Sequence, residues 1–122
     1  MPAIIVANGP QLGVFLVLGK APIVLGRDQA SNLQLEDVQA SRRHIQIRVG
    51  GDGLYRVTDM KSSNGTMLNG GKLEEEQTLA DGDEIVVGET HLRFTADVPV
   101  SGANALELLK KAGERHRSTL VR

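Results

Sequence analysis

The sequence contains no cysteine and no tryptophan, and aromatic residues make up 2% of its 122 positions. Without cysteine, a disulfide framework, a thiolate zinc site and a cysteine nucleophile are all excluded. Proteins that bind nucleic acid by base stacking need aromatic platforms, which this chain lacks. The hydrophobic core must therefore be built mainly from Val, Ile and Leu.

An excess of charge of one sign is missing as well, because the chain has 14 basic and 15 acidic residues and its formal net charge is −1. A chain that binds a nucleic acid backbone normally carries a strong positive field. We therefore expect no nucleic acid partner, and any anion site must be local.

Long hydrophobic runs are also absent. The longest apolar stretch, residues 14–18, is far too short to span a bilayer. The apolar residues 4–6 have no charged segment before them and are followed by a turn at Asn8-Gly9-Pro10, which does not match a signal peptide. The sequence thus predicts a cytoplasmic protein without a membrane partner.

Short apolar runs separated by turn residues dominate the first hundred positions, and the chain has 14 glycines. This pattern is typical of an all-β sandwich or barrel. Alternation is clearest where Ile45, Ile47 and Val49 are interleaved with Gln46 and Arg48. The expected strands are 3–7, 13–18, 23–25, 33–35, 45–49, 54–58, 66–68, 84–87 and 91–95, with a brief return beginning at 72–73.

The pattern changes after Pro99, where helix-forming residues replace the strand pattern. Asn104 is a candidate N-cap, Glu107 follows three residues later, and Gly113 is a candidate stop. These signals predict a short helix at about 104–112 and a loose basic tail at 114–122. We expect a domain at 1–98 and a C-terminal tail at 99–122.

Four short motifs combine turn residues with side chains suited to phosphate. A phosphothreonine carries about −1.5 to −2 charges and three strong acceptor oxygens. One guanidinium, two hydroxyls and a neighbouring amide on adjacent loops provide the donors that such a group requires. The motifs are Gly26-Arg27, Ser41-Arg42-Arg43-His44, Ser62-Ser63-Asn64-Gly65-Thr66 and Asn69-Gly70.

Enzymatic sites find little support in the sequence. Ser41, His44 and Asp59 suggest a hydrolase triad, but no nucleophile elbow surrounds the serine. His44, His91 and His116 lack metal-site spacing. The residues between Gly13 and Lys20 do not fit a Walker loop. We expect no catalysis, no cofactor and no metal.

In their residues and their order, the four motifs resemble the signature of the forkhead-associated (FHA) domain, and the resemblance covers about residues 2–96. It implies an FHA-type β-sandwich of two mostly antiparallel sheets, followed by a short helical or disordered tail. It also assigns roles to residues. The implied phosphopeptide contacts are Arg27, Ser41, Arg42, Ser63 and Asn64, and the implied supports of the site are Gly26, His44, Gly65, Thr66, Asn69 and Gly70.

The resemblance further implies a module that recognises phosphothreonine on protein partners in serine/threonine-kinase signalling, the partner being a kinase or one of its substrates. The alternative is an FHA-like scaffold that binds partners through another face, independently of phosphate. The identity of the partner, the ligand sequence preference and the role of the tail are left open by the sequence.

Overall fold

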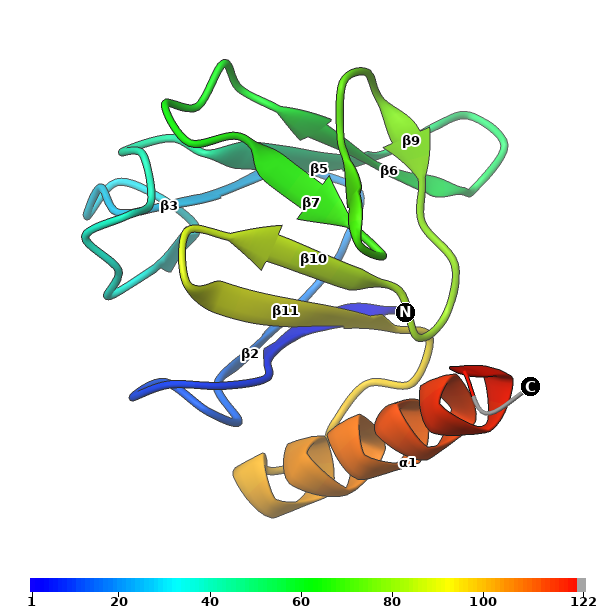
Figure 1. Ribbon diagram of the computed structural model, residues 1–122. Helices are drawn as coiled ribbons and strands as arrows, with labels where there is room; N and C mark the ends of the chain where they lie inside the picture. Colours follow the sequence, from blue (N-terminus) through cyan, green and yellow to red (C-terminus); the bar gives the residue numbers. More distant parts are fainter. Residues whose placement is uncertain (121–122) are drawn as a thin grey trace.

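The computed structural model describes residues 1–120, with side-chain surroundings for residues 1–111. It consists of two facing β-sheets and one C-terminal helix (Figure 1). The elements are β1 (Ala3–Val6), β2 (Phe15–Val17), β3 (Ile23–Gly26), β4 (Leu33–Gln34), β5 (Ile45–Val49), β6 (Tyr55–Asp59), β7 (Thr66–Leu68), β8 (Gly71–Lys72), β9 (Gln77–Thr78), β10 (Glu84–Val87), β11 (Thr90–Thr95) and α1 (Gly102–Leu120).

The first sheet has the strand order β2-β1-β11-β10-β7-β8, and the second has the order β4-β3-β5-β6-β9. Every strand pair is antiparallel except β3 with β4, which is parallel. The prediction of an all-β sandwich with two mostly antiparallel sheets is therefore confirmed. The expected strands are all present within a few residues, but β9 was not predicted.

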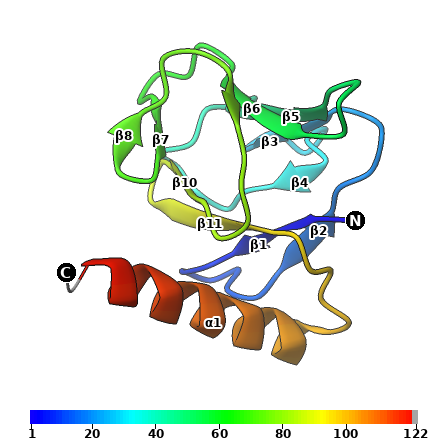
Figure 2. The ribbon, with the colours of Figure 1, turned by 90° about the vertical axis from the view of Figure 1, so that its right-hand side faces the viewer.

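The core lies between the sheets and is aliphatic, as the shortage of aromatic residues requires. On β5, Ile45 and Ile47 are buried whereas Arg48 is exposed, so the alternating pattern correctly predicted one inward face. Strand β1 is different, because all four of its residues are buried. Figures 1 and 2 show α1 beneath the first sheet, on the side away from the second sheet, which explains why both faces of β1 are apolar.

The helix differs from the prediction of 104–112. It starts earlier because Ser101, rather than Asn104, is the N-cap: the Ser101 Oγ accepts the Asn104 N–H at 3.1 Å, while the Asn104 side chain accepts the Val100 N–H at 3.0 Å. It also continues through Gly113 to Leu120. The loose tail expected at 114–122 is thus wrong for 114–120, and residues 121–122 lie outside the described part.

Burial of Ala105 shows that the first turns of α1 pack on the sandwich. Within residues 1–120, no helix combines the length and the apolar character needed to cross a membrane. The division into a domain at 1–98 and a tail at 99–122 stays a prediction.

Three segments, which carry the first three sequence motifs, meet at one end of the sandwich, on the left in Figure 1. They are the end of β3, the β4–β5 connection (residues 35–44) and the β6–β7 connection (residues 60–65). Antiparallel pairing of β3 with β5 and of β5 with β6 brings these segments to the same end.

Candidate functional site

The Gly26-Arg27 motif is joined to the β4–β5 connection by backbone hydrogen bonds. The Arg27 N–H donates to the Ser41 carbonyl at 3.0 Å, and the Asp28 N–H donates to the Arg42 carbonyl at 3.1 Å. A Cβ atom on Gly26 would lie 2.1 Å from the Arg42 carbonyl oxygen and 2.9 Å from that of Ser41. Only glycine therefore allows β3 to approach the Ser41 segment this closely.

The Arg27 side chain is exposed but anchored at its base. Its Nε donates a hydrogen bond to the Ala40 carbonyl at 3.1 Å, which fixes the orientation of the guanidinium plane. The two terminal amino groups bond to no residue in the described part of the chain. They are donors held in place and open to solvent, as binding of an external anion requires.

Ser41 and Ser63 are brought into direct contact although 22 positions separate them. The Ser63 N–H donates to the Ser41 Oγ at 3.0 Å. Because this bond uses a lone pair of the hydroxyl, the Ser41 O–H proton is left to donate to a ligand. The Ser63 side chain is exposed, and within residues 1–111 its hydroxyl has no partner.

Asn64 follows Ser63 and is oriented by the β4–β5 connection. Its Nδ2 donates to the Gln39 carbonyl at 2.8 Å and to the Gln39 Oε1 at 3.3 Å. The carbonyl oxygen of the Asn64 amide is thereby left as an acceptor for a main-chain N–H of a ligand.

His44 connects the two loops from below and is completely buried. Its Nδ1 accepts the Ser41 N–H at 2.9 Å, so the ring proton resides on Nε2, which donates to the Gly65 carbonyl at 2.8 Å. Both ring nitrogens are therefore occupied by backbone groups. The imidazole does not face the Ser41 hydroxyl, so the triad suggested by the sequence does not form.

Asp59 organises the β6–β7 connection from the end of β6. Its carboxylate accepts the Ser62 N–H at 3.1 Å, the Ser62 hydroxyl, and the Thr66 hydroxyl at 2.6 Å. Partial burial would raise the pKa of Asp59, but the hydrogen bonds from Ser62 and Thr66, with the nearby His44, outweigh burial and lower it. The carboxylate thus stays ionised and holds the loop that carries Ser63.

Asp37 has the corresponding role on the opposite side, and no sequence motif indicated it. Its Oδ2 accepts the Thr90 hydroxyl at 2.7 Å and the Glu89 N–H at 2.8 Å, and its Oδ1 accepts the Gln39 N–H at 2.9 Å. Burial opposes its ionisation, but these hydrogen bonds prevail and lower its pKa. Asp37 therefore ties the loop bearing Ser41 to the turn between β10 and β11. An isolated aspartate in a polar loop could not reveal partners more than fifty residues away.

The remaining support residues shape the backbone. Gly65 has φ +78°, and Asn69 and Gly70 have φ +50° and +84°, so the last two form the primed turn between β7 and β8. The Asn69 side chain also bonds to Asp83 at 3.0 Å and to the Glu84 N–H at 2.9 Å. Asn69 and Gly70 thus lie at the end of β7 opposite Gly65 and do not reach the other motif residues.

The loops also carry a local positive charge. Arg42, Arg43 and Lys61 are exposed, and none of their side chains has a hydrogen-bond or ion-pair partner within residues 1–111. The Arg42 carbonyl, by contrast, accepts from the Asp28 N–H and from the Ser31 hydroxyl at 3.3 Å. No cluster of His, Cys, Asp or Glu suited to a metal ion occurs among the described residues.

Comparison with known proteins identifies this arrangement. Residues 23–88 match the family model of the FHA domain. The chain is 37% identical over 93 residues to an oxoglutarate dehydrogenase inhibitor of Corynebacterium efficiens, covering 76% of this chain and 64% of the relative. It is 36% identical over 104 residues to the glycogen accumulation regulator GarA of Mycolicibacterium smegmatis, covering 84% and 65%. The chain thus spans just under two thirds of these relatives.

Among solved structures, the N-terminal FHA domain of S. cerevisiae Rad53p, in complex with a phosphothreonine peptide, superposes with a TM-score of 0.70 and 29% identity. The match covers 79% of this chain and 93% of that domain. The matched family region contains all four motifs and the three segments, from β3, the β4–β5 connection and the β6–β7 connection, that meet at the site. The chain therefore belongs to the FHA domain family.

Proposed function

We propose that this protein binds phosphothreonine on protein partners in serine/threonine-kinase signalling, through Arg27, Ser41, Arg42, Ser63 and Asn64. One observation carries the proposal: separate loops place an anchored guanidinium and two hydroxyls together, with their donor groups open to solvent. The likeness to a domain solved with a phosphothreonine peptide supports it.

The chemistry of the site favours a dianion over a neutral ligand. Each charge-assisted hydrogen bond contributes about 1.5–3 kcal/mol net. Arg27 supplies two donors and the serine hydroxyls supply one each, which suits three phosphate oxygens. Arg42 adds a cation at the rim, and Asn64 offers its amide oxygen to the ligand main chain.

Among the described residues of the site, neither His44 nor Asp59 is free to act as a general base on a bound phosphopeptide. His44 uses both ring nitrogens on backbone groups, and the Asp59 carboxylate is engaged by hydroxyl and amide donors. We therefore propose a binding module without catalytic activity or cofactor. The names of the relatives, an inhibitor and a regulator, support action through protein–protein contact. A cytoplasmic location stays a prediction.

A phosphothreonine peptide library, probed with the whole chain, tests the proposal. We expect peptides whose binding is lost after phosphatase treatment, and at least tenfold weaker binding with Arg27→Ala and with Ser41→Ala. The matched control is Arg48→Ala, because Arg48 is equally cationic but lies inside β5 and pairs with Glu76 at 2.8 Å. It should bind as the unmodified protein does.

Binding that survives both dephosphorylation and Arg27→Ala would reject the proposal. A partner captured equally well by the Ser41→Ala protein would support the phosphate-independent scaffold instead.

A further inference from the structure

Glycine follows three of the five asparagines in the chain, at Asn8-Gly9, Asn64-Gly65 and Asn69-Gly70. In such a pair the glycine nitrogen can attack the carbonyl carbon of the asparagine side chain, which leads to deamidation, the release of the amide nitrogen as ammonia. Glycine is the least obstructive successor, because it has no Cβ and adopts a wide range of backbone angles. The second pair lies in the proposed phosphate site, so this reaction bears on binding there.

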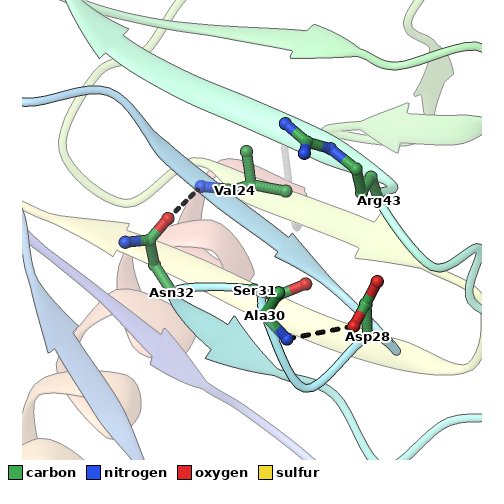
Figure 3. Close-up of a pocket in the computed structure, with 6 residues that line it drawn as sticks. All are labelled: Val24, Asp28, Ala30, Ser31, Asn32 and Arg43. Carbon is green, nitrogen blue, oxygen red and sulfur yellow. Dashed lines mark hydrogen bonds between the residues drawn. The ribbon is translucent and has the colours of Figure 1, made fainter.

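The other two asparagines are poor candidates for deamidation. Leu33 follows Asn32, and the Asn32 Oδ1 accepts the Val24 N–H at 2.8 Å, as Figure 3 shows. Asn104 lies in α1, where its Oδ1 accepts the Val100 N–H at 3.0 Å. In both places a residue larger than glycine follows, and a hydrogen bond fixes the amide. Rapid deamidation is therefore confined to the three Asn-Gly pairs.

The attacking nitrogen does not distinguish the three pairs, because none of their glycine N–H groups donates a hydrogen bond within residues 1–111. The asparagine side chains differ instead. At the β10–β11 turn, the Asn8 Nδ2 donates to the Glu89 carbonyl at 3.0 Å, and the Asn8 Oδ1 accepts the His91 N–H at 2.8 Å. The Asn8 amide is therefore fixed at both its nitrogen and its oxygen.

The Asn69 amide is also fixed at both ends. Its Nδ2 donates to the Asp83 carboxylate at 3.0 Å, and its Oδ1 accepts the Glu84 N–H at 2.9 Å. The main-chain N–H of Asn69 donates to the Glu84 carbonyl at 2.8 Å, and positive φ angles at Asn69 and Gly70 keep both residues in the primed turn. Attack by the Gly70 nitrogen would require these contacts to break together.

Asn64 is fixed at its nitrogen only. The Nδ2 donates to the Gln39 carbonyl at 2.8 Å and to the Gln39 Oε1 at 3.3 Å, whereas the Oδ1 has no donor within residues 1–111. The side chain is exposed, and it lies in the β6–β7 connection rather than in a two-residue turn. The Asn64 amide can therefore turn about its bonded nitrogen and present its carbonyl carbon to Gly65.

Charge in the β6–β7 connection favours reaction at the same residue. Negative charge develops on the asparagine Oδ1 as the nitrogen adds to the carbonyl, and nearby cations stabilise such charge. Lys61, three residues before Asn64, is exposed and has no ion-pair partner within residues 1–111. Asn69 instead bonds to the Asp83 carboxylate, which opposes negative charge at its side chain. Hydrogen bonding and electrostatics thus both rank Asn64 above Asn69.

The reaction balances without an oxidant, a cofactor or an enzyme. The Gly65 nitrogen bonds to the Asn64 Cγ, the Cγ–Nδ2 bond breaks, and the Gly65 proton leaves with the amide nitrogen as ammonia. The product is a cyclic succinimide, in which the Gly65 nitrogen joins two carbonyl carbons. Water then opens one of the two carbon–nitrogen bonds and leaves either aspartate or isoaspartate at position 64.

Either product removes what Asn64 supplies to the site. A carboxylate replaces the neutral amide in a site that is to accept a phosphate dianion, and like charges repel. The carboxylate also faces the Gln39 carbonyl with an acceptor instead of a donor, so the bond that orients the side chain is lost. Isoaspartate in addition lengthens the main chain before Gly65, whose carbonyl accepts the His44 Nε2–H at 2.8 Å. These changes weaken phosphopeptide binding.

We propose that Asn64-Gly65 is a site of spontaneous deamidation, and that its conversion to aspartate or isoaspartate switches phosphopeptide binding off. The loss of binding rests on the proposed function, whereas the covalent step does not. A copy of the protein that is not repaired thus loses its binding capacity with age.

Incubation of the full chain at physiological temperature and slightly alkaline pH, followed by peptide mapping with mass spectrometry, measures conversion at each asparagine. Asn8 and Asn69 are controls within the same sample. Asn64 should convert faster than either by about fivefold or more, the factor expected when no bond at the amide oxygen has to break. In urea-unfolded protein the three rates should converge, because the hydrogen bonds that protect Asn8 and Asn69 are then absent.

Calorimetry with a phosphothreonine peptide that the library yields measures binding before and after incubation. Converted protein, separated by ion exchange, should bind more weakly by about tenfold or more. Asn64→Asp should reproduce this loss in fresh protein. Asn104→Asp is the matched control, because it adds the same charge in the first turn of α1, where a carboxylate can still accept the Val100 N–H. It should bind as the unmodified protein does.

The outcomes separate the two proposals. If Asn64 in folded protein converts no faster than Asn8 and Asn69, the modification site is overturned. If converted protein keeps its affinity for the phosphopeptide, the switch is overturned while the proposed function stands. If no phosphopeptide binds fresh protein in an Arg27-dependent manner, the proposed function fails and the switch with it, and the conversion rates still decide whether Asn64 is the modified residue.

Discussion

Replacement of Gly26 by alanine tests whether close approach of β3 to the Ser41 segment creates the site. The added methyl group would lie 2.1 Å from the Arg42 carbonyl oxygen and 2.7 Å from the carbonyl carbon. Carbon–oxygen contacts are normally no shorter than about 3.3 Å. Because the atoms in the way belong to the backbone, no side-chain rotation relieves the clash, and the segments must separate by about 1 Å.

That separation has a defined energetic consequence. The two backbone hydrogen bonds joining the segments, at 3.0 and 3.1 Å, would lengthen beyond useful range. Losing them costs about 0.5–1.5 kcal/mol each, and forcing an extra methyl into a packed region costs about 1–3 kcal/mol. We expect Gly26→Ala to lower the free energy of unfolding by about 2–6 kcal/mol.

Ligand binding should weaken as well, because Arg27 and Ser41 lie on opposite sides of the widened contact. Loss of one charge-assisted hydrogen bond, about 1.5–3 kcal/mol, corresponds to at least tenfold weaker phosphopeptide binding. Urea unfolding followed by circular dichroism, and calorimetric titration of folded protein, measure the two effects.

Gly19→Ala is the matched control. A Cβ atom on Gly19 meets nothing within 4 Å, and its backbone does not require positive φ. It should leave stability unchanged or raise it by up to about 1 kcal/mol. If Gly26→Ala matched the unmodified protein in both urea midpoint and affinity, the close-approach argument would be refuted.

Three further changes probe the framework. His44→Ala should destabilise by about 2–5 kcal/mol in urea unfolding, because two buried backbone groups lose their partner; an unchanged midpoint would contradict the bracing role. Since Asp59 has a folded pKa below its usual 3.8, its contribution is complete above that pH and is lost as pH falls through the folded pKa. Asp59→Asn should therefore reduce stability at pH 7 and flatten the acid decline, and an equally steep decline would argue against it. Asn69→Ala, which loses two hydrogen bonds and keeps a positive φ, should cost about 1–3 kcal/mol without changing phosphopeptide affinity; a matching loss of affinity would place Asn69 among the contacts.

Most strands could be predicted because hydrophobic alternation and turn residues are local features of the sequence. Alternation at Ile45 and Ile47, and the Asn69-Gly70 turn, are encoded by residues adjacent in sequence. Strand β9 escaped prediction because Gln77 and Thr78 are exposed edge residues with no apolar member. The helix extended beyond Gly113 because a single glycine costs only about 1 kcal/mol in a helix, too little to end it.

The candidate site also has a part that the sequence predicts and a part that it does not. Its residue types, a guanidinium, hydroxyls and an amide near turns, are readable from the sequence, because donor chemistry belongs to the individual side chain. Its supports were less accessible, because Asp37 looked like an ordinary loop residue in the sequence although its carboxylate bonds to Thr90.

The sequence by itself determined the sandwich, its turn positions and the phosphate-compatible donors, since hydrophobic alternation, backbone preference and side-chain chemistry are local properties. Only the tertiary structure decided which donors are open and which are occupied. The Ser41 hydroxyl meets the Ser63 N–H, the His44 ring bonds to two loops, and Asp37 bonds across to β11. Such pairings depend on segments distant in sequence meeting in space, and no local pattern specifies them.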